Sequence, residues 1–236
     1  VSRGSLIAAG VMCLIFTLRL DRVEENLFPR HVLSLFAPVG TAYWVFLLLS
    51  AAYTPMTIFM PLALRQIYGL DPLWIGYVLT VFSIAWTIGS LVTAGWSDRW
   101  TRIACASGLM FTSLSILGIA ITLGETSIWV LTGFVTVAGI GVGMTNVHSI
   151  SWALAAAGEA ESRITASAAP AMRSIGIAYG AAISGLVANG AGLAGGTEPA
   201  TVEYALSWVF ALGAVVPLAG SLCVLRMYQL KPGVEI

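Results

Sequence analysis

Residues 74–123 read WIGYVLTVFSIAWTIGSLVTAGWSDRWTRIACASGLMFTSLSILGIAITL, and they indicate the fold class of the chain. Two apolar runs, each close to the roughly 20 residues that a helix needs to cross a bilayer core, flank a short charged segment. Asp98, Arg99 and Arg102 lie there within five residues. Charged side chains are costly inside a bilayer and stable at its surface. The stretch therefore predicts two transmembrane helices joined by a tight turn at a membrane surface.

The composition of the whole chain agrees with a membrane protein. Of its 236 residues, 58% are hydrophobic and only 9% are charged, and the mean hydropathy is +0.91. A soluble domain carries roughly a quarter charged residues. The net charge is zero, which gives no electrostatic basis for binding nucleic acid. The three cysteines lie in apolar stretches without metal-ligand spacing, so we expect buried hydrophobes and no metal or cofactor site.

Seven segments of the chain are long and apolar enough to span a bilayer, or nearly so. Helices are expected because lipid offers no partners to open backbone groups, and the period-two alternation of a membrane barrel is absent. We therefore predict an all-α integral membrane protein. The predicted spans are Gly4–Leu20, Thr41–Leu64, Trp74–Gly95, Ile103–Leu123, Ser127–Ala157, Ala171–Ala194 and Val202–Met227.

The distribution of basic residues predicts the orientation of these spans. Eight of the eleven lysines and arginines flank the first, third and fifth connections or follow the last span. Because basic residues favour the cytoplasmic side, we place these connections and the C-terminus in the cytoplasm. The eight residues are Arg19, Arg22, Arg30, Arg99, Arg102, Arg163, Arg226 and Lys231.

The charged turn also carries a recognisable pattern, AGWSDRWTR. It resembles the signature between two helices of the major facilitator superfamily. That signature has a Gly followed after three residues by Asp, then a basic residue (Arg or Lys), then after one further residue a second Gly, and finally more basic residues. Asp98, Arg99 and Arg102 match this signature, whereas Ala94 and Thr101 replace its two glycines. In that family the turn acts as a conformational latch to the opposite half of the protein. A solvated cytoplasmic turn is the alternative interpretation.

Three further stretches resemble the fourteen-span drug:proton antiporter branch of that superfamily. They are ENLFPRHVLSLF at 25–36, PLALRQIYGLDPLWIG at 61–76 and RSIGIAYGAAISG at 173–185. The resemblance implies a six-helix C-terminal bundle over 41–236, with inverted repeats at about 41–123 and 127–228. Residues 1–20 would then be the preceding transmembrane helix and 21–40 a cytoplasmic linker, so we expect a partial chain.

The resemblance implies a function as well as a fold. A secondary active transporter of the bacterial inner membrane is expected, exporting drugs or amphipathic metabolites by proton antiport. Its partners would be the lipid bilayer, a small-molecule substrate, and a missing N-terminal half or another bundle. The alternative is a half-protein that does not transport and acts as a structural or regulatory partner. An enzyme is not expected, because His148 and Ser149 are adjacent, point about 100° apart on a helix and have no orienting acid.

Several residues within the spans are candidates for lining a cavity or vestibule. An arginine inside a span is usually functional, although Arg173 would snorkel to the headgroups if its helix began near Ala171. His148, close to Asn146, is either a proton-coupling group or a packing histidine. Aromatic candidates for the cavity wall include Trp86 and Tyr179, besides Tyr43, Tyr53 and Trp152. No Asp or Glu falls deep in a span, so the proton-carrying carboxylate is expected elsewhere or the coupling differs.

Small residues recur at helical spacing in two of the spans. Such residues let helices approach closely, which suits either moving bundles or ordinary static packing. The residues predicted to serve helix packing are Gly139, Gly143, Gly176, Gly180 and Gly185.

Overall fold

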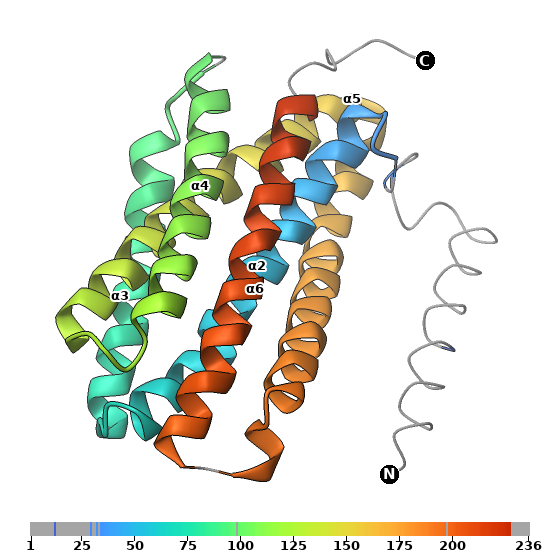
Figure 1. Ribbon diagram of the computed structural model, residues 1–236. Helices are drawn as coiled ribbons and strands as arrows, with labels where there is room; N and C mark the ends of the chain where they lie inside the picture. The colour runs from blue at the N-terminus through green and yellow to red at the C-terminus, as the bar shows by residue number, and fades with distance from the viewer. Residues whose placement is uncertain are drawn as a thin grey trace.

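The computed structural model describes Met12, Pro29, Val32 and residues 34–97, 99–196 and 198–227, except for the side chains of 158–160 and 227. Over these residues the regular structure is helical, with no strand (Figure 1). The elements are α2 (Pro38–Gln66), α3 (Pro72–Thr93), α4 (Arg99–Thr122), α5 (Ile128–Gly190), a 3-10 turn η1 (Leu193–Gly195) and α6 (Pro199–Met227). The predicted first span and most of the predicted linker, 21–40, lie outside the described residues.

The long helix α5 contains two membrane-length segments rather than one. Its first arm, Ile128–Ala157, and its second arm, Glu161–Gly190, run in opposite directions, although helical backbone continues between them (Figure 1). Together with α2, α3, α4 and α6, the described residues therefore supply six helical segments long and apolar enough to cross a membrane. Both the fold class and the number of spans after the first agree with the sequence prediction.

The start of the second arm differs from the prediction. We expected a span over Ala171–Ala194, whereas the arm begins at Glu161 and includes Pro170 within the helix. Residues 161–170, ESRITASAAP, contain two charges and several hydroxyls, which lower the local hydropathy. Their three alanines nevertheless favour a helix, and the helix continues through Pro170 although a proline inside a helix cannot donate one of the backbone hydrogen bonds. The other spans begin and end within a few residues of the predicted positions.

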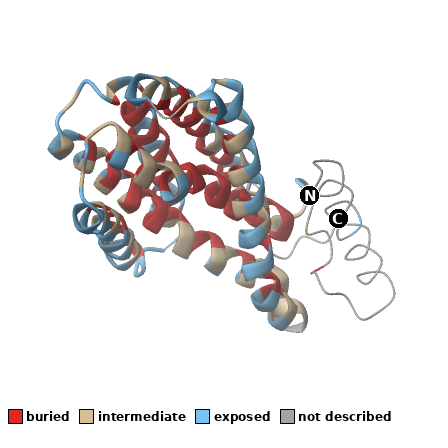
Figure 2. Cartoon of the chain, turned by 90° about the horizontal axis from the view of Figure 1, so that it is seen from below, coloured by how far each residue is buried: buried red, intermediate tan, exposed pale blue. Residues whose placement is uncertain are grey.

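The exposed surface of the bundle has two different faces. On α4 from Ile103 onward, and on α6 from Tyr204 to Leu225, the exposed side chains are essentially apolar. On α3 and the second arm of α5, exposed hydroxyls, two arginines and one asparagine interrupt the apolar surface. These polar residues are Thr80, Ser83 and Thr87 on α3 and Arg163, Ser167, Arg173, Ser174 and Asn189 on the second arm. Buried residues, red in Figure 2, fill the space between the helices.

Candidate functional site

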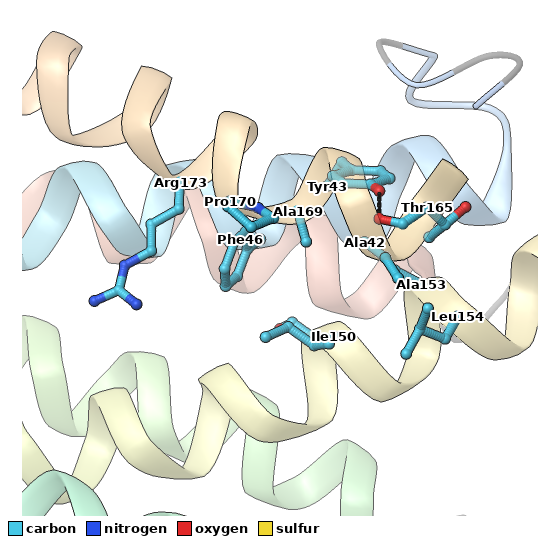
Figure 3. A pocket seen from close by; sticks show the side chains of 12 residues that line it. Ala42, Tyr43, Phe46, Ile150, Ala153, Leu154, Thr165, Ala169, Pro170 and Arg173 are labelled. Atoms are coloured by element: carbon cyan, nitrogen blue, oxygen red, sulfur yellow. Dashed lines mark hydrogen bonds between the residues drawn. The ribbon is translucent and has the colours of Figure 1, made fainter. Parts of the chain in front are cut away.

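A pocket of about 290 Å³ lies between α2 and the two arms of α5 (Figure 3). Its size is at the lower end of the range of small-molecule sites, roughly 300–1,000 Å³. Neither α3, α4 nor α6 contributes to its wall. The lining residues are Ala42, Tyr43, Phe46, Ser149, Ile150, Ala153, Leu154, Thr165, Ala166, Ala169, Pro170 and Arg173. Most of this wall is therefore hydrocarbon, with a few polar groups at defined positions.

Arg173 lies at one end of the pocket and is held by two aromatic side chains. Its Nε donates a hydrogen bond to Tyr53 Oη at 3.0 Å. The guanidinium carbon lies 5.3 Å from the ring centroid of Trp86 and 5.9 Å from that of Tyr53. The two rings meet edge to face at 5.2 Å. Helices α2, α3 and the second arm thus position one cation by a hydrogen bond and cation–π contacts.

The position of Arg173 along its helix follows from the helix boundary. It lies twelve residues beyond Glu161, the start of the second arm, which corresponds to roughly 18 Å along the helix axis. The helix does not begin near Ala171, which was the condition for expecting this side chain at the headgroups. The helix begins earlier, so Arg173 lies well past its first turn.

The opposite end of the pocket is closed by a hydrogen bond between α2 and the second arm. Tyr43 Oη donates to the carbonyl oxygen of Thr165 at 2.6 Å, and both residues are buried. The side-chain Oγ1 of Thr165 is also buried and has no hydrogen-bond partner among the described residues. Thr165 and Arg173 are eight residues apart on one helix, so roughly 12 Å separates the two polar ends.

His148 and Asn146 lie on the first arm but do not line the pocket. His148 is only 4% exposed and its imidazole hydrogen-bonds the backbone of Thr93 at the end of α3. Its Nε2 has no partner among the described residues. The structure thus places His148 in a helix–helix contact, and Asn146 beside it is half-buried.

Two of the aromatic candidates, Trp86 and Tyr179, have different positions. Trp86 is half-buried in the cluster around Arg173, where its ring also meets that of Phe82 at 6.0 Å. Tyr179 is 55% exposed on the second arm and lies outside the pocket. The sequence could not separate them, because both are aromatic residues within a predicted span.

The charged turn is described only in part, since Asp98 lies outside the described residues. Arg99 and Arg102 are exposed at the start of α4. The rings of Trp96 and Trp100 meet edge to face at 6.1 Å. The latch remains a prediction, because the described residues include neither Asp98 nor an identified partner for it.

Four of the five predicted packing glycines lie against neighbouring helices. A Cβ on Gly176 or Gly180 would lie within 2.6 Å of a carbonyl oxygen of α2, and one on Gly139 within 2.6 Å of a carbonyl oxygen of α3. A Cβ on Gly143 would also collide with α3. Gly185 differs from the expectation, since a Cβ there would meet nothing within 4 Å among the described residues.

Comparison with known proteins identifies the family. The model of the Major Facilitator Superfamily matches residues 3–181, which is more than half of the chain. The chain belongs to the Major Facilitator Superfamily. Two curated relatives from Mycobacterium tuberculosis, strains CDC 1551 / Oshkosh and ATCC 25618 / H37Rv, are each described as a probable multidrug-efflux transporter.

Each of these relatives is 25% identical over 197 residues, which cover 79% of this chain and 40% of the relative. The chain therefore spans about two fifths of the length of the curated relatives it matches. Membership of the Major Facilitator Superfamily and six membrane-length helices establish a multi-pass membrane protein of a transporter family. The family points to transport and away from enzymatic catalysis, in agreement with the sequence prediction.

Part of the pocket in this superfamily member could not be found by sequence reasoning. Thr165 carries no signal beyond its hydroxyl, and its segment was not assigned to a span. Small side chains on both arms, Ala153 and Ala169 among them, leave the space that the pocket occupies. The one available signal is the alanine-rich run 166–171, which is compatible with a close-packed helix but does not indicate a cavity.

Proposed function

We propose that this chain supplies one helical bundle of a secondary active transporter that exports amphipathic compounds by alternating access. Family membership and the description of the two relatives support this assignment. The structural observation that carries it is the difference between the two exposed faces of the bundle. The apolar surface of α4 and α6 suits lipid, whereas the surface of α3 and the second arm suits a polar pathway.

The polar face has the chemistry expected beside an aqueous pathway. Thr80 and Thr87 donate to backbone carbonyls one turn earlier, at 2.8 and 3.0 Å, so these hydroxyls are satisfied without a lipid-side partner. A backbone carbonyl of the same helix cannot compensate the charge of Arg173 in this way, and a guanidinium that faces hydrocarbon is costly. We infer that this face borders the substrate path and meets a second bundle. One bundle alone forms only one wall of such a path.

Proton coupling is proposed to depend on the other bundle. The acidic residues among the described parts of the chain lie near helix ends, in the connections or at the junction of the two arms: Asp71, Glu125, Glu159, Glu161, Glu198 and Glu203. A proton carrier normally requires a carboxylate within the membrane. Buried His148 is the alternative coupling group within this chain. We further propose a bacterial inner-membrane location, with the turn at 96–102 and the C-terminus in the cytoplasm.

A non-transporting role as a structural or regulatory partner is the second candidate function. It is favoured by one observation: the described helices form a single bundle. Both functions predict a folded, membrane-inserted chain. They differ in whether solute moves when a complementary bundle is present.

The experiment is a flux assay in proteoliposomes. The purified chain is reconstituted alone and together with the N-terminal bundle of the same transporter, and ethidium movement is followed under an imposed proton gradient. We expect flux only when both bundles are present. Absence of flux from the complete, folded assembly with a panel of amphipathic dyes would contradict the transporter assignment and favour the partner role. Flux from the chain alone would contradict the one-wall argument.

A further inference from the structure

The chemistry of the pocket identifies a class of ligand. We propose that it binds an amphipathic anion, whose carboxylate, sulfonate or phosphate group pairs with Arg173 and whose apolar body lies between the two arms of α5. This inference rests on the proposed transport function, since it names the substrate class of that same bundle. The pocket itself is a property of this chain and can be tested without transport.

The guanidinium of Arg173 is oriented and still has donors to offer. Its Nε is occupied by Tyr53, and its plane lies near the rings of Tyr53 and Trp86. Arginine has five N–H donors, so the two terminal nitrogens retain four. No salt bridge to Arg173 is found among the described residues. Because guanidinium stays charged at every relevant pH and presents a planar fork, an oxyanion with two oxygens is its natural partner.

The remainder of the pocket favours an apolar body. Beyond Arg173, Figure 3 shows Phe46, Ile150 and Leu154 along the wall. Alanines at 42, 153 and 169 keep the space open. At the far end, roughly 12 Å from Arg173 along the helix, Thr165 has a buried Oγ1 without a hydrogen-bond partner among the described residues. A ligand with an anionic head and a medium-length tail fits these dimensions.

The same lining disfavours a cation. Among the described residues that line the pocket none is Asp or Glu, so no carboxylate among them would offset the repulsion between Arg173 and a cationic drug. The structure also supplies a comparison within the molecule. A second pocket of about 290 Å³ lies between α3 and the first arm, with Trp74, Tyr77 and Trp129 in its wall and no charged side chain among its described lining residues. Binding there is expected to be indifferent to the sign of the ligand's charge.

The experiment uses two probes that share a ten-carbon tail, decanesulfonate and decyltrimethylammonium. Binding to the purified chain in phosphatidylcholine nanodiscs is measured by titration calorimetry, with empty nanodiscs subtracted. We expect the sulfonate to bind more tightly. Arg173→Gln should weaken sulfonate binding by about tenfold to a hundredfold, the usual loss for a hydrogen bond to a charged group. Binding of the ammonium should stay unchanged or become tighter.

Two further variants serve as a matched control and as an independent test of the pocket. Arg163→Gln removes an exposed arginine from the same arm outside the pocket, so it should leave both affinities unchanged. Ala169→Leu retains the charge of Arg173 but fills the pocket from a partly exposed position, so it should weaken the sulfonate even if Arg173→Gln fails to fold. Wild-type sulfonate affinity in folded Arg173→Gln, or in Ala169→Leu, would overturn the proposal.

An anionic phospholipid also has an anionic head and an apolar tail. The lipid composition of the nanodiscs distinguishes it from a free solute. The proposed ligand is a solute and not a lipid of the bilayer. Adding phosphatidylglycerol to the nanodiscs should therefore not displace decanesulfonate from the wild-type chain. Displacement that disappears in Arg173→Gln would show that lipid occupies the pocket and would overturn the solute assignment. Because binding is measured without a second bundle, sulfonate binding can succeed while flux fails, or the reverse. The two proposals therefore fail separately.

Discussion

Replacement of Gly143 by alanine tests the contact between the first arm of α5 and α3. A Cβ at this position would collide with the carbonyl oxygen of Trp86 and would lie 2.8 Å from the amide nitrogen of Ser90. These are backbone atoms, so the clash is relieved only if one helix moves. The same contact contains the hydrogen bond from Ser90 Oγ to the carbonyl oxygen of Gly143, at 3.2 Å. Overpacking of this kind costs about 1–3 kcal/mol.

Gly133 provides the matched control. It lies ten residues earlier on the same arm, and a Cβ there meets nothing within 4 Å. Alanine is favoured over glycine in a helix by about 1 kcal/mol at either position, so the difference between the two variants isolates the clash. That difference, about 1–3 kcal/mol, corresponds to a Tm lower by roughly 2–12 °C for Gly143→Ala than for Gly133→Ala in a chain of this size.

Thermal unfolding of the purified chain in detergent measures this difference. A thiol-reactive fluorophore reports unfolding through Cys105, which is buried on α4 in the folded chain. Equal Tm values for the two variants would refute the reasoning, because they would show that α3 and the first arm do not approach closely at Gly143. A loss of stability in Gly133→Ala as large as that in Gly143→Ala would refute it as well.

Three other predictions concern the ends of the helices. Tyr43→Phe removes the donor to the Thr165 carbonyl and should lower the free energy of unfolding by about 1 kcal/mol, measured by the same thermal assay. Burial raises the pKa of Tyr68, in the turn after α2, above 10.0, and the nearby charge of Glu203 adds to this while the Gly124 backbone amide opposes it. The folded state thus favours neutral Tyr68. The contribution of this group to stability is therefore complete below about pH 10 and is lost as the pH rises through the raised pKa. Between about pH 8 and about pH 11, the Tm of Tyr68→Phe should fall by less than the Tm of the wild-type chain. A single cysteine at Ser97, in a background without native cysteines, should react with a membrane-impermeant maleimide in inverted vesicles but not in intact cells.

The helices of this bundle were largely predictable because hydropathy and helix-start signals agree. Pro38, Pro72 and Pro199 open α2, α3 and α6, where a missing backbone N–H costs nothing. The exception is the first part of the second arm, 161–170. There the helix is maintained by alanine content and by packing against α2, and neither is visible to a search for apolar runs.

The site was less predictable, because its geometry depends on contacts between distant segments. Arg173 could be singled out, since a charge in an apolar span is evident from the sequence. Its partner Tyr53 is 120 residues away, and Trp86 lies on a third helix. The packing glycines were predictable only in part for the same reason. A spacing of four residues predicts a helix face of small residues, but the geometry of the helix crossing decides which of these residues touch the neighbouring helix. Gly180 touches α2, whereas Gly185 does not.

The way in which Arg173 is stabilised has a consequence for what the bundle can recognise. A neighbouring carboxylate would neutralise the guanidinium, and a ligand would then have to break an ion pair before it could bind. Aromatic faces and one phenolic oxygen instead hold the side chain in place and leave its charge unneutralised. The cost of keeping that charge is lowered by the exposure of Arg173 on the polar face of the bundle. An arginine held in this way is oriented before a ligand arrives, so little side-chain entropy remains to be lost on binding an oxyanion.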